Sequence, residues 1–127
     1  MPYKTMMSIA ATVPLLFSVA FLVVPHFFIL GTYPDAEGLA LEVGITQRYV
    51  MAGMIFMVLC LLFQSRNVEK VDDQKAILLG VSIGFAVMCA VIVVLEGPVR
   101  GLPLLVPPTI ATGAIAILSF WSRSKLS

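Results

Sequence analysis

Five side chains that could do chemistry lie near the ends of apolar stretches of this chain. They are His26, Gln47, Arg48, Glu96 and Arg100. An arginine can hold an anionic group, and a histidine can titrate near neutral pH. Two interpretations follow from these residue types. The cluster is either a network of ion pairs that holds the loop ends together, or a pocket that opens outward and binds an anionic ligand.

The elements that position these residues are four apolar stretches, each long enough to cross a bilayer as a helix of about 20 residues. Of the 127 residues, 60% are hydrophobic and 12% are charged. We therefore expect an all-α fold, a four-helix up-and-down bundle in a membrane, forming a single domain over residues 1–127. The expected helices cover residues 6–30, 44–63, 76–95 and 102–121.

The basic residues predict how this bundle faces. Antiparallel helices place both termini and the connection around residues 64–75 on one side of the membrane. That side carries Lys4, Arg66, Lys70, Lys75, Arg123 and Lys125, whereas the other side carries only Arg48 and Arg100. Because cytoplasmic loops are enriched in lysine and arginine, both termini are expected in the cytoplasm. The prediction is a multi-pass protein of the cell membrane, which in a bacterium is the inner membrane.

The same topology brings the five polar residues to one end of the bundle. His26 closes the first helix, Gln47 and Arg48 open the second, Glu96 ends the third and Arg100 follows in the next turn. A compact bundle would therefore bring several of them within reach of one another. Arg48 is expected about one turn inside its helix, where it must extend outward or pair with a carboxylate.

The connections and small residues leave several alternatives open. The alternating apolar pattern between Thr32 and Val43 indicates an extended surface segment or a short interfacial helix. Pro14 should bend the first helix.

Cys60 and Cys89 are expected at different depths, so we interpret them as unpaired, buried, small hydrophobic residues. The small-residue rows of the third helix favour packing within the chain or, alternatively, a homodimer face.

Several kinds of chemistry lack the residues that they need. A single histidine cannot provide bis-histidine haem ligation, and no Cys-x-x-Cys pair is present. Proton-coupled transport usually needs an ionisable group deep in the membrane, and none is found there. We therefore expect no cofactor, no metal and no catalytic residue. The formal net charge of +1 gives no reason to expect nucleic acid as a partner.

A loop that leads into Gln47-Arg48-Tyr49, a glycine at position 53 and the turn Glu96-Gly97-Pro98-Val99-Arg100-Gly101 lie on this four-span background. The pattern resembles the DoxX-like small membrane proteins and related four-helix families of uncharacterised function. Prolines at the start of the fourth helix depart from it. The resemblance implies a fold and a topology. It implies no catalytic residue, because these families have no generally assigned reaction.

Three functions are compatible with the sequence. The first is a non-catalytic accessory or assembly subunit, embedded in the bilayer and packed against itself or a larger membrane complex. The alternative is a protein that binds or transports a small molecule or lipid, with a pocket at the outer ends of the helices. A membrane enzyme comes third, with His26 as its only candidate base.

Overall fold

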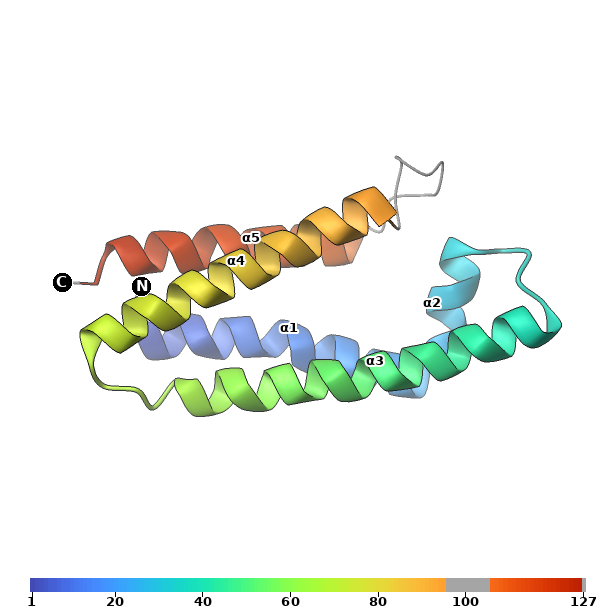
Figure 1. Cartoon of the computed structure of the whole chain (residues 1–127), viewed down its shortest axis with the longest axis horizontal. Helices are drawn as coiled ribbons and strands as arrows, with labels where there is room; N and C mark the ends of the chain where they lie inside the picture. The colour runs from blue at the N-terminus through green and yellow to red at the C-terminus, as the bar shows by residue number, and fades with distance from the viewer. Residues whose placement is uncertain (96–105, 127) are drawn as a thin grey trace.

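The computed structural model describes residues 1–95 and 106–126, which form five helices (Figure 1). They are α1 (Tyr3–Val23), α2 (Pro25–Thr32), α3 (Gly38–Ser65), α4 (Val71–Leu95) and α5 (Val106–Ser124). The prediction of an all-helical fold is confirmed for this part of the chain. Four of the helices run side by side along the long axis, and the short α2 lies at one end (Figure 1).

Three of these helices are long enough and apolar enough to cross a membrane. They are α1, α3 and α4, with 21, 28 and 25 residues. This is consistent with the membrane protein that the sequence predicts. The helix α5 has 19 residues and does not belong to this set. Residues 102–105, the start of the fourth expected span, lie outside the described residues.

The first expected helix, residues 6–30, is divided into two. Val24 leaves the helical conformation, with φ −132° and ψ 53°, and its N–H still bonds to the carbonyl of Ala20. Pro25 then has no N–H to continue the ladder, but it suits the first position of a new helix. The chain therefore turns at Val24 and continues as α2. Pro14, by contrast, lies inside α1, which continues past it as one helix.

The second expected helix begins earlier than the sequence suggested. Gly38 has φ +53°, a conformation that favours glycine, and α3 starts there. The second half of the segment predicted to be extended or interfacial, residues 38–43, thus forms the first turns of α3. As a result, Arg48 lies almost three turns inside the helix rather than about one.

The long helices form two antiparallel hairpins, which we call the first hairpin (α1 and α3) and the second hairpin (α4 and α5). In the first, Ser18 Oγ donates to the carbonyl of Ala52 at 3.0 Å; in the second, Ser82 Oγ donates to the carbonyl of Ala116 at 2.8 Å. The two serines, and likewise the two alanines, are 64 residues apart in the sequence. The hairpins are therefore held by the same bond at equivalent positions.

The two hairpins meet on one side only. α1 packs against α5, whereas α3 and α4 make hardly any direct contact along their lengths. A buried cluster joins the hairpins near the chain termini, where Met6, Met7 and Ala10 pack with Leu78 and Ile115. The two termini lie at this same end of the molecule (Figure 1).

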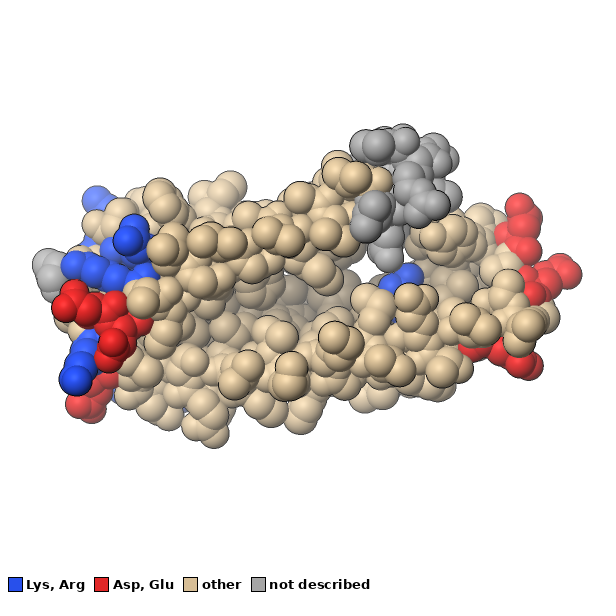
Figure 2. All heavy atoms as spheres, viewed as in Figure 1, with Lys and Arg blue, Asp and Glu red and all other residues tan. Residues whose placement is uncertain are grey.

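Charged side chains gather at the two ends of the long axis (Figure 2). The end with the termini carries both basic and acidic residues, and the opposite end shows acidic ones. Those acidic residues are Asp35, Glu37 and Glu42, in the connection before α3 and in its first turns. The length between the two ends is almost entirely uncharged on the face drawn, as a helix in hydrocarbon requires.

Candidate functional site

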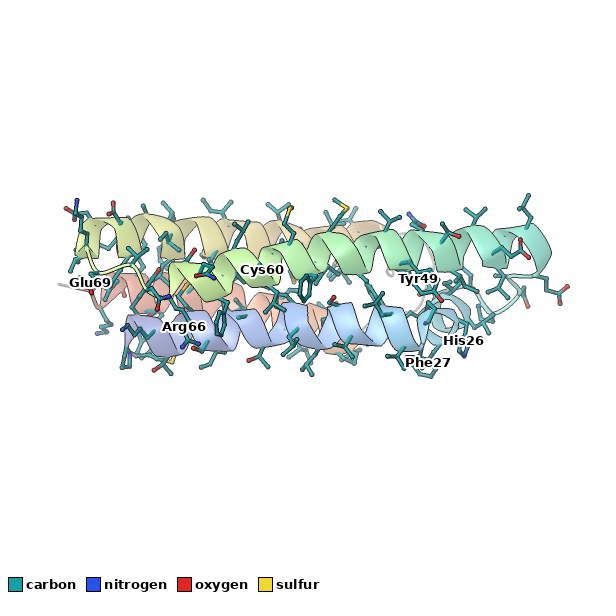
Figure 3. All side chains as sticks on the ribbon, turned by 90° about the horizontal axis from the view of Figure 1, so that it is seen from below. His26, Phe27, Tyr49, Cys60, Arg66 and Glu69 are labelled. Carbon is teal, nitrogen blue, oxygen red and sulfur yellow. The ribbon has the colours of Figure 1, made fainter. Side chains whose placement is uncertain are left out.

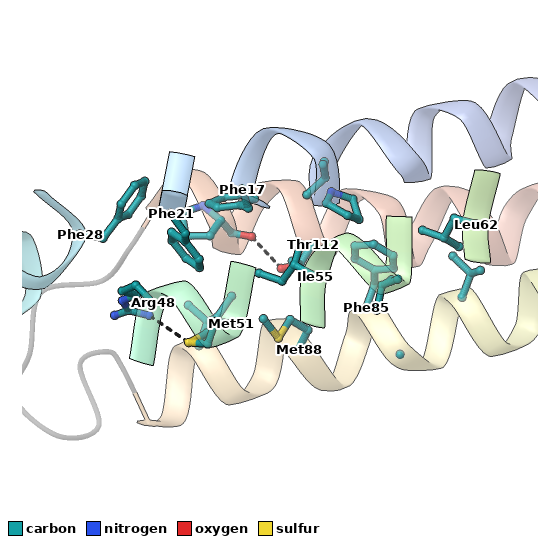
Figure 4. A pocket seen from close by; sticks show the side chains of 17 residues that line it. Phe17, Phe21, Phe28, Arg48, Met51, Ile55, Leu62, Phe85, Met88 and Thr112 are labelled. Atoms are coloured by element: carbon teal, nitrogen blue, oxygen red, sulfur yellow. Dashed lines mark hydrogen bonds between the residues drawn. The ribbon is translucent and has the colours of Figure 1, made fainter. Parts of the chain in front are cut away.

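A cavity of about 350 Å³ lies between the two hairpins. It runs from Arg48 and Phe28 at one end to Leu62 at the other (Figure 4). Fourteen residues of α3 separate Arg48 from Leu62, which corresponds to about 21 Å along the helix axis. All five helices contribute to its wall. The cavity is thus the space left where the hairpins separate.

The wall is almost entirely apolar. Phe17, Phe21 and Phe85 line it together with aliphatic side chains and methionines from α3 and α4 (Figure 4). Among the described residues, Arg48 is the one charged side chain in the lining. Such a wall matches apolar molecules, with a single cationic contact at one end.

Arg48 is turned into the protein and only 8% exposed. Its Nη1 donates to Met51 Sδ at 3.5 Å (Figure 4), and its guanidinium carbon lies 5.2 Å from the centre of the Phe21 ring. The face of an aromatic ring attracts a cation, and a planar guanidinium stacks on it well. Of the two alternatives that the sequence left open for Arg48, a side chain that extends outward does not agree with this burial. The other alternative, a pair with a carboxylate, stays a prediction.

The aromatic end of the cavity depends on the break between α1 and α2. The rings of Phe21 on α1 and Phe28 on α2 meet edge to face, with centres 4.8 Å apart. Phe17 lies edge to face with Phe21 at 6.0 Å. Because the chain turns at Val24, α2 brings Phe28 back towards the end of α1. The same turn fixes the ring on which Arg48 lies.

The second hairpin supplies a polar side chain of a different kind. Thr112 is 64 residues after Arg48 and also lines the cavity. Its Oγ1 donates to the carbonyl of Pro108 at 2.7 Å, within α5. The hydroxyl proton of Thr112 is thus used within its own helix.

A second hollow of about 570 Å³ lies beside the first, at the acidic end of the molecule. It is lined by residues of α2, the following connection and the start of α3, including Tyr33, Asp35 and Gln47. Arg48 lines both hollows. The arginine therefore stands between the apolar cavity and the hollow at the acidic end.

The structure brings together only part of the predicted polar cluster. Gln47 is exposed and Arg48 is buried, and both line the second hollow, whereas Arg48 alone of the two lines the apolar cavity. His26 is exposed on α2 and points away from the long helices (Figure 3), and it lines neither hollow. Glu96 and Arg100 lie outside the described residues. His26 therefore does not join Arg48 in a site.

The cysteines are both free, but one of them is not buried as predicted. Cys60 is exposed on α3, whereas Cys89 on α4 is half-buried and directs its Sγ at the carbonyl of Thr109, 3.6 Å away. Within residues 1–95 and 106–126, no group of three or more histidine, cysteine or acidic residues could hold a metal ion.

Most of the cavity wall was not predicted from the sequence, because apolar residues of this kind do not stand out in an apolar helix. The residues that were not predicted include Phe21, Gly84, Phe85 and Met88. One signal could have found two of them, because Phe21 and Phe85 are related by the same 64-residue shift as Ser18 and Ser82.

Comparison of the chain with models of protein families, with curated proteins and with solved structures gave no match. The resemblance to DoxX-like proteins therefore stays a prediction. Any function must be argued from the cavity itself.

Proposed function

We propose that this protein binds an apolar small molecule of lipid type inside the membrane, in the cavity between its two hairpins. The observation that supports the proposal is a cavity of about 350 Å³ whose described lining residues are apolar apart from Arg48 and Thr112. This volume lies within the usual range of ligand pockets, about 300–1,000 Å³. Protein interiors are otherwise closely packed, with few voids larger than a water molecule.

The lining favours binding or transport over catalysis. A guanidinium group has five N–H donors and no acceptor atom, so it suits the binding of a polar or anionic group rather than the acceptance of a proton. Arg48 can orient the polar end of an amphipathic molecule while the aromatic and aliphatic wall holds the rest. The pocket in this proposal lies deeper than the one expected from the sequence. Of the five predicted polar residues, Arg48 alone among the described ones is part of it.

The proposal includes a topology with four membrane crossings and both termini in the cytoplasm of a cell. α5 would be about 28 Å long, close to the roughly 30 Å of a bilayer core. Basic residues at the end with the termini support this orientation. A reagent that cannot cross the membrane should label a cysteine placed at Asp35 in intact cells but not one placed at Ser124.

Binding can be tested by a substitution that fills the cavity with a larger side chain without disturbing the packing of the helices. Gly84 lines the cavity on α4, and a Cβ added to it meets nothing within 4 Å. Gly84→Leu should therefore occupy the cavity and exclude a ligand. Gly80 is the matched control, because it lies one turn away on the same helix, has the same free space and does not line the cavity.

The readout is native mass spectrometry of protein released from a mild detergent. We expect the wild type and Gly80→Leu to retain a bound apolar molecule, and Gly84→Leu to lose it. An equal amount of bound lipid on all three proteins would contradict the proposal. Circular dichroism of the three proteins checks that helix content is unchanged.

A second candidate function is the accessory subunit. The observation that favours it is that Gly53 on α3 and Gly80 on α4 are exposed, with nothing within 4 Å of an added Cβ. A partner helix could approach closely at such positions. Blue-native electrophoresis in a mild detergent tests this function. A strictly monomeric protein with no co-purifying chain would count against it.

A further inference from the structure

We infer that the cavity takes up one acyl chain of a bilayer lipid sideways, through an opening between α3 and α4. The inference rests on the proposed function and deepens it, because it names the ligand class and its route. We call this feature the side opening and define its rim by Val58 on α3 and by Gly84 and Met88 on α4.

The rim consists of those residues of the cavity wall that are exposed on the surface. Val58 is 40% exposed and Met88 is 39% exposed, and Gly84 is exposed as well. All the other described residues that line the cavity are buried or half-buried, including those on α1 and α5. Figure 2 shows the corresponding hollow between α4 and α3. The cavity therefore opens to the side, between these two helices.

The opening arises because the two similar hairpins do not face each other symmetrically. If the hairpins faced each other symmetrically, α3 would meet α4 in the way that α1 meets α5. α1 and α5 are in contact, whereas α3 and α4 make hardly any direct contact outside the buried cluster that contains Leu62 and Leu78. The hairpins thus close on one side and diverge on the other.

The depth of the side opening indicates what lies in front of it. Val58 lies ten residues along α3 from Arg48 and seven residues before the helix ends at Ser65, which correspond to about 15 Å and about 10 Å along the axis. No charged residue lies between Arg48 and the end of α3. In a bilayer this depth is occupied by lipid acyl chains. One leaflet of hydrocarbon is about 15 Å thick, and the cavity extends for about 21 Å from Arg48 to Leu62. An acyl chain of one leaflet therefore fits along it.

Arg48 sets the direction in which the chain lies. It is the charged group of the lining and lies at the end nearer the acidic residues. The polar end of the lipid would lie beside Arg48, and its acyl chain would extend along the cavity in the direction of Leu62. The other route into the cavity passes Arg48 from the second hollow, and a water-soluble ligand would need that route.

The experiment blocks the rim and measures lipid exchange. Cysteines at Val58 and Met88 are reacted with a bulky pyrene maleimide. Cysteines at Met57 and Val87 serve as controls, because these neighbours on the same helices are exposed and do not line the cavity. All four variants carry Cys60→Ser and Cys89→Ala, so that the added thiol alone reacts.

Each labelled protein is placed in vesicles of phosphatidylglycerol with deuterated acyl chains, and native mass spectrometry follows the uptake of deuterated lipid with time. Labelling at Val58 or Met88 should slow uptake at least about tenfold. Labelling at Met57 or Val87 should leave it within about twofold of the unlabelled protein. Helix content from circular dichroism should be the same in all four.

The outcomes separate this inference from the proposed function. Unchanged uptake after rim labelling, together with loss of bound lipid in Gly84→Leu, would overturn the side opening and leave the binding function standing. Bound lipid that persists in both experiments would overturn both. Crosslinking of Val58→Cys to Val58→Cys between two copies would show that a second chain covers the opening, which also contradicts the inference.

Discussion

The two hairpins are built alike, but among the described residues the first hairpin alone places a charged side chain in the cavity wall. Both are held by a serine that donates to the carbonyl of an alanine 34 residues later, and both present a phenylalanine, Phe21 or Phe85, to the cavity. At the next pair of equivalent positions the first has Arg48 and the second has Thr112. The repeated residues hold the hairpins, and the residues that differ give the cavity a polar end.

The contact between α1 and α5 should be the part of the structure most sensitive to mutation. Met6 is fully buried in the cluster that joins the hairpins. Met6→Ala leaves a void there and should lower the free energy of unfolding by about 2–4 kcal/mol. Denaturation in mixed detergent micelles, followed by circular dichroism, measures the change. Met54→Ala is the control, because Met54 is 61% exposed. A loss as large for Met54→Ala would contradict this account of the contact.

Replacing Arg48 should lower the free energy of unfolding more than replacing Thr112. Arg48→Ala removes the contacts with Phe21 and Met51 and enlarges the cavity. It should lower the free energy of unfolding by about 2–3 kcal/mol. Thr112→Ala removes a bond within one helix and should cost about 1 kcal/mol or less. Equal losses in the same denaturation measurement would show that the two positions do not differ as the geometry indicates.

The two repeated serines should make similar and independent contributions to the free energy of unfolding. Ser18→Ala and Ser82→Ala each remove one bond between helices, and each should cost about 0.5–1.5 kcal/mol. Because the bonds lie in different hairpins, the costs should add in the double variant. A double-mutant cycle measures this. A coupling of more than about 0.5 kcal/mol would mean that the hairpins are not independent units.

The cysteines should show the smallest difference, in labelling rate. Cys60 is exposed on α3, whereas Cys89 is half-buried and its Sγ faces α5. A membrane-permeant maleimide should therefore react with Cys60 several times faster than with Cys89. Mass spectrometry of the two cysteine peptides against time measures both rates. The reverse order of labelling would contradict the placement of α4 against α5.

The helices could be predicted from the sequence, and their ends could be predicted less well. Long uncharged stretches dictate membrane helices because unpaired backbone groups and charges are costly in hydrocarbon. Pro25 marks a helix start, but a continuous apolar pattern on both sides concealed the break at Val24. The alternation of Leu39, Leu41 and Val43 resembled a strand, although α3 had already begun at Gly38.

The cavity could not be predicted from local sequence. Its existence depends on how far the hairpins diverge, and that divergence comes from packing between residues distant in the chain. Arg48 was recognised as unusual, but its inward direction depends on where α3 starts and on where Phe21 lies. A search for the 64-residue repeat would have indicated two similar hairpins. It would not have shown that only one side closes.

The most direct test of the central claim maps where a lipid touches the protein. Protein in vesicles that contain a phospholipid with a diazirine on its acyl chain is irradiated, and the adducts are located by peptide mass spectrometry. The account predicts adducts on Ile55 and Phe85, which line the cavity, in addition to lipid-facing Phe56 and Val87. Adducts on Phe56 and Val87 with none on Ile55 or Phe85 would contradict it.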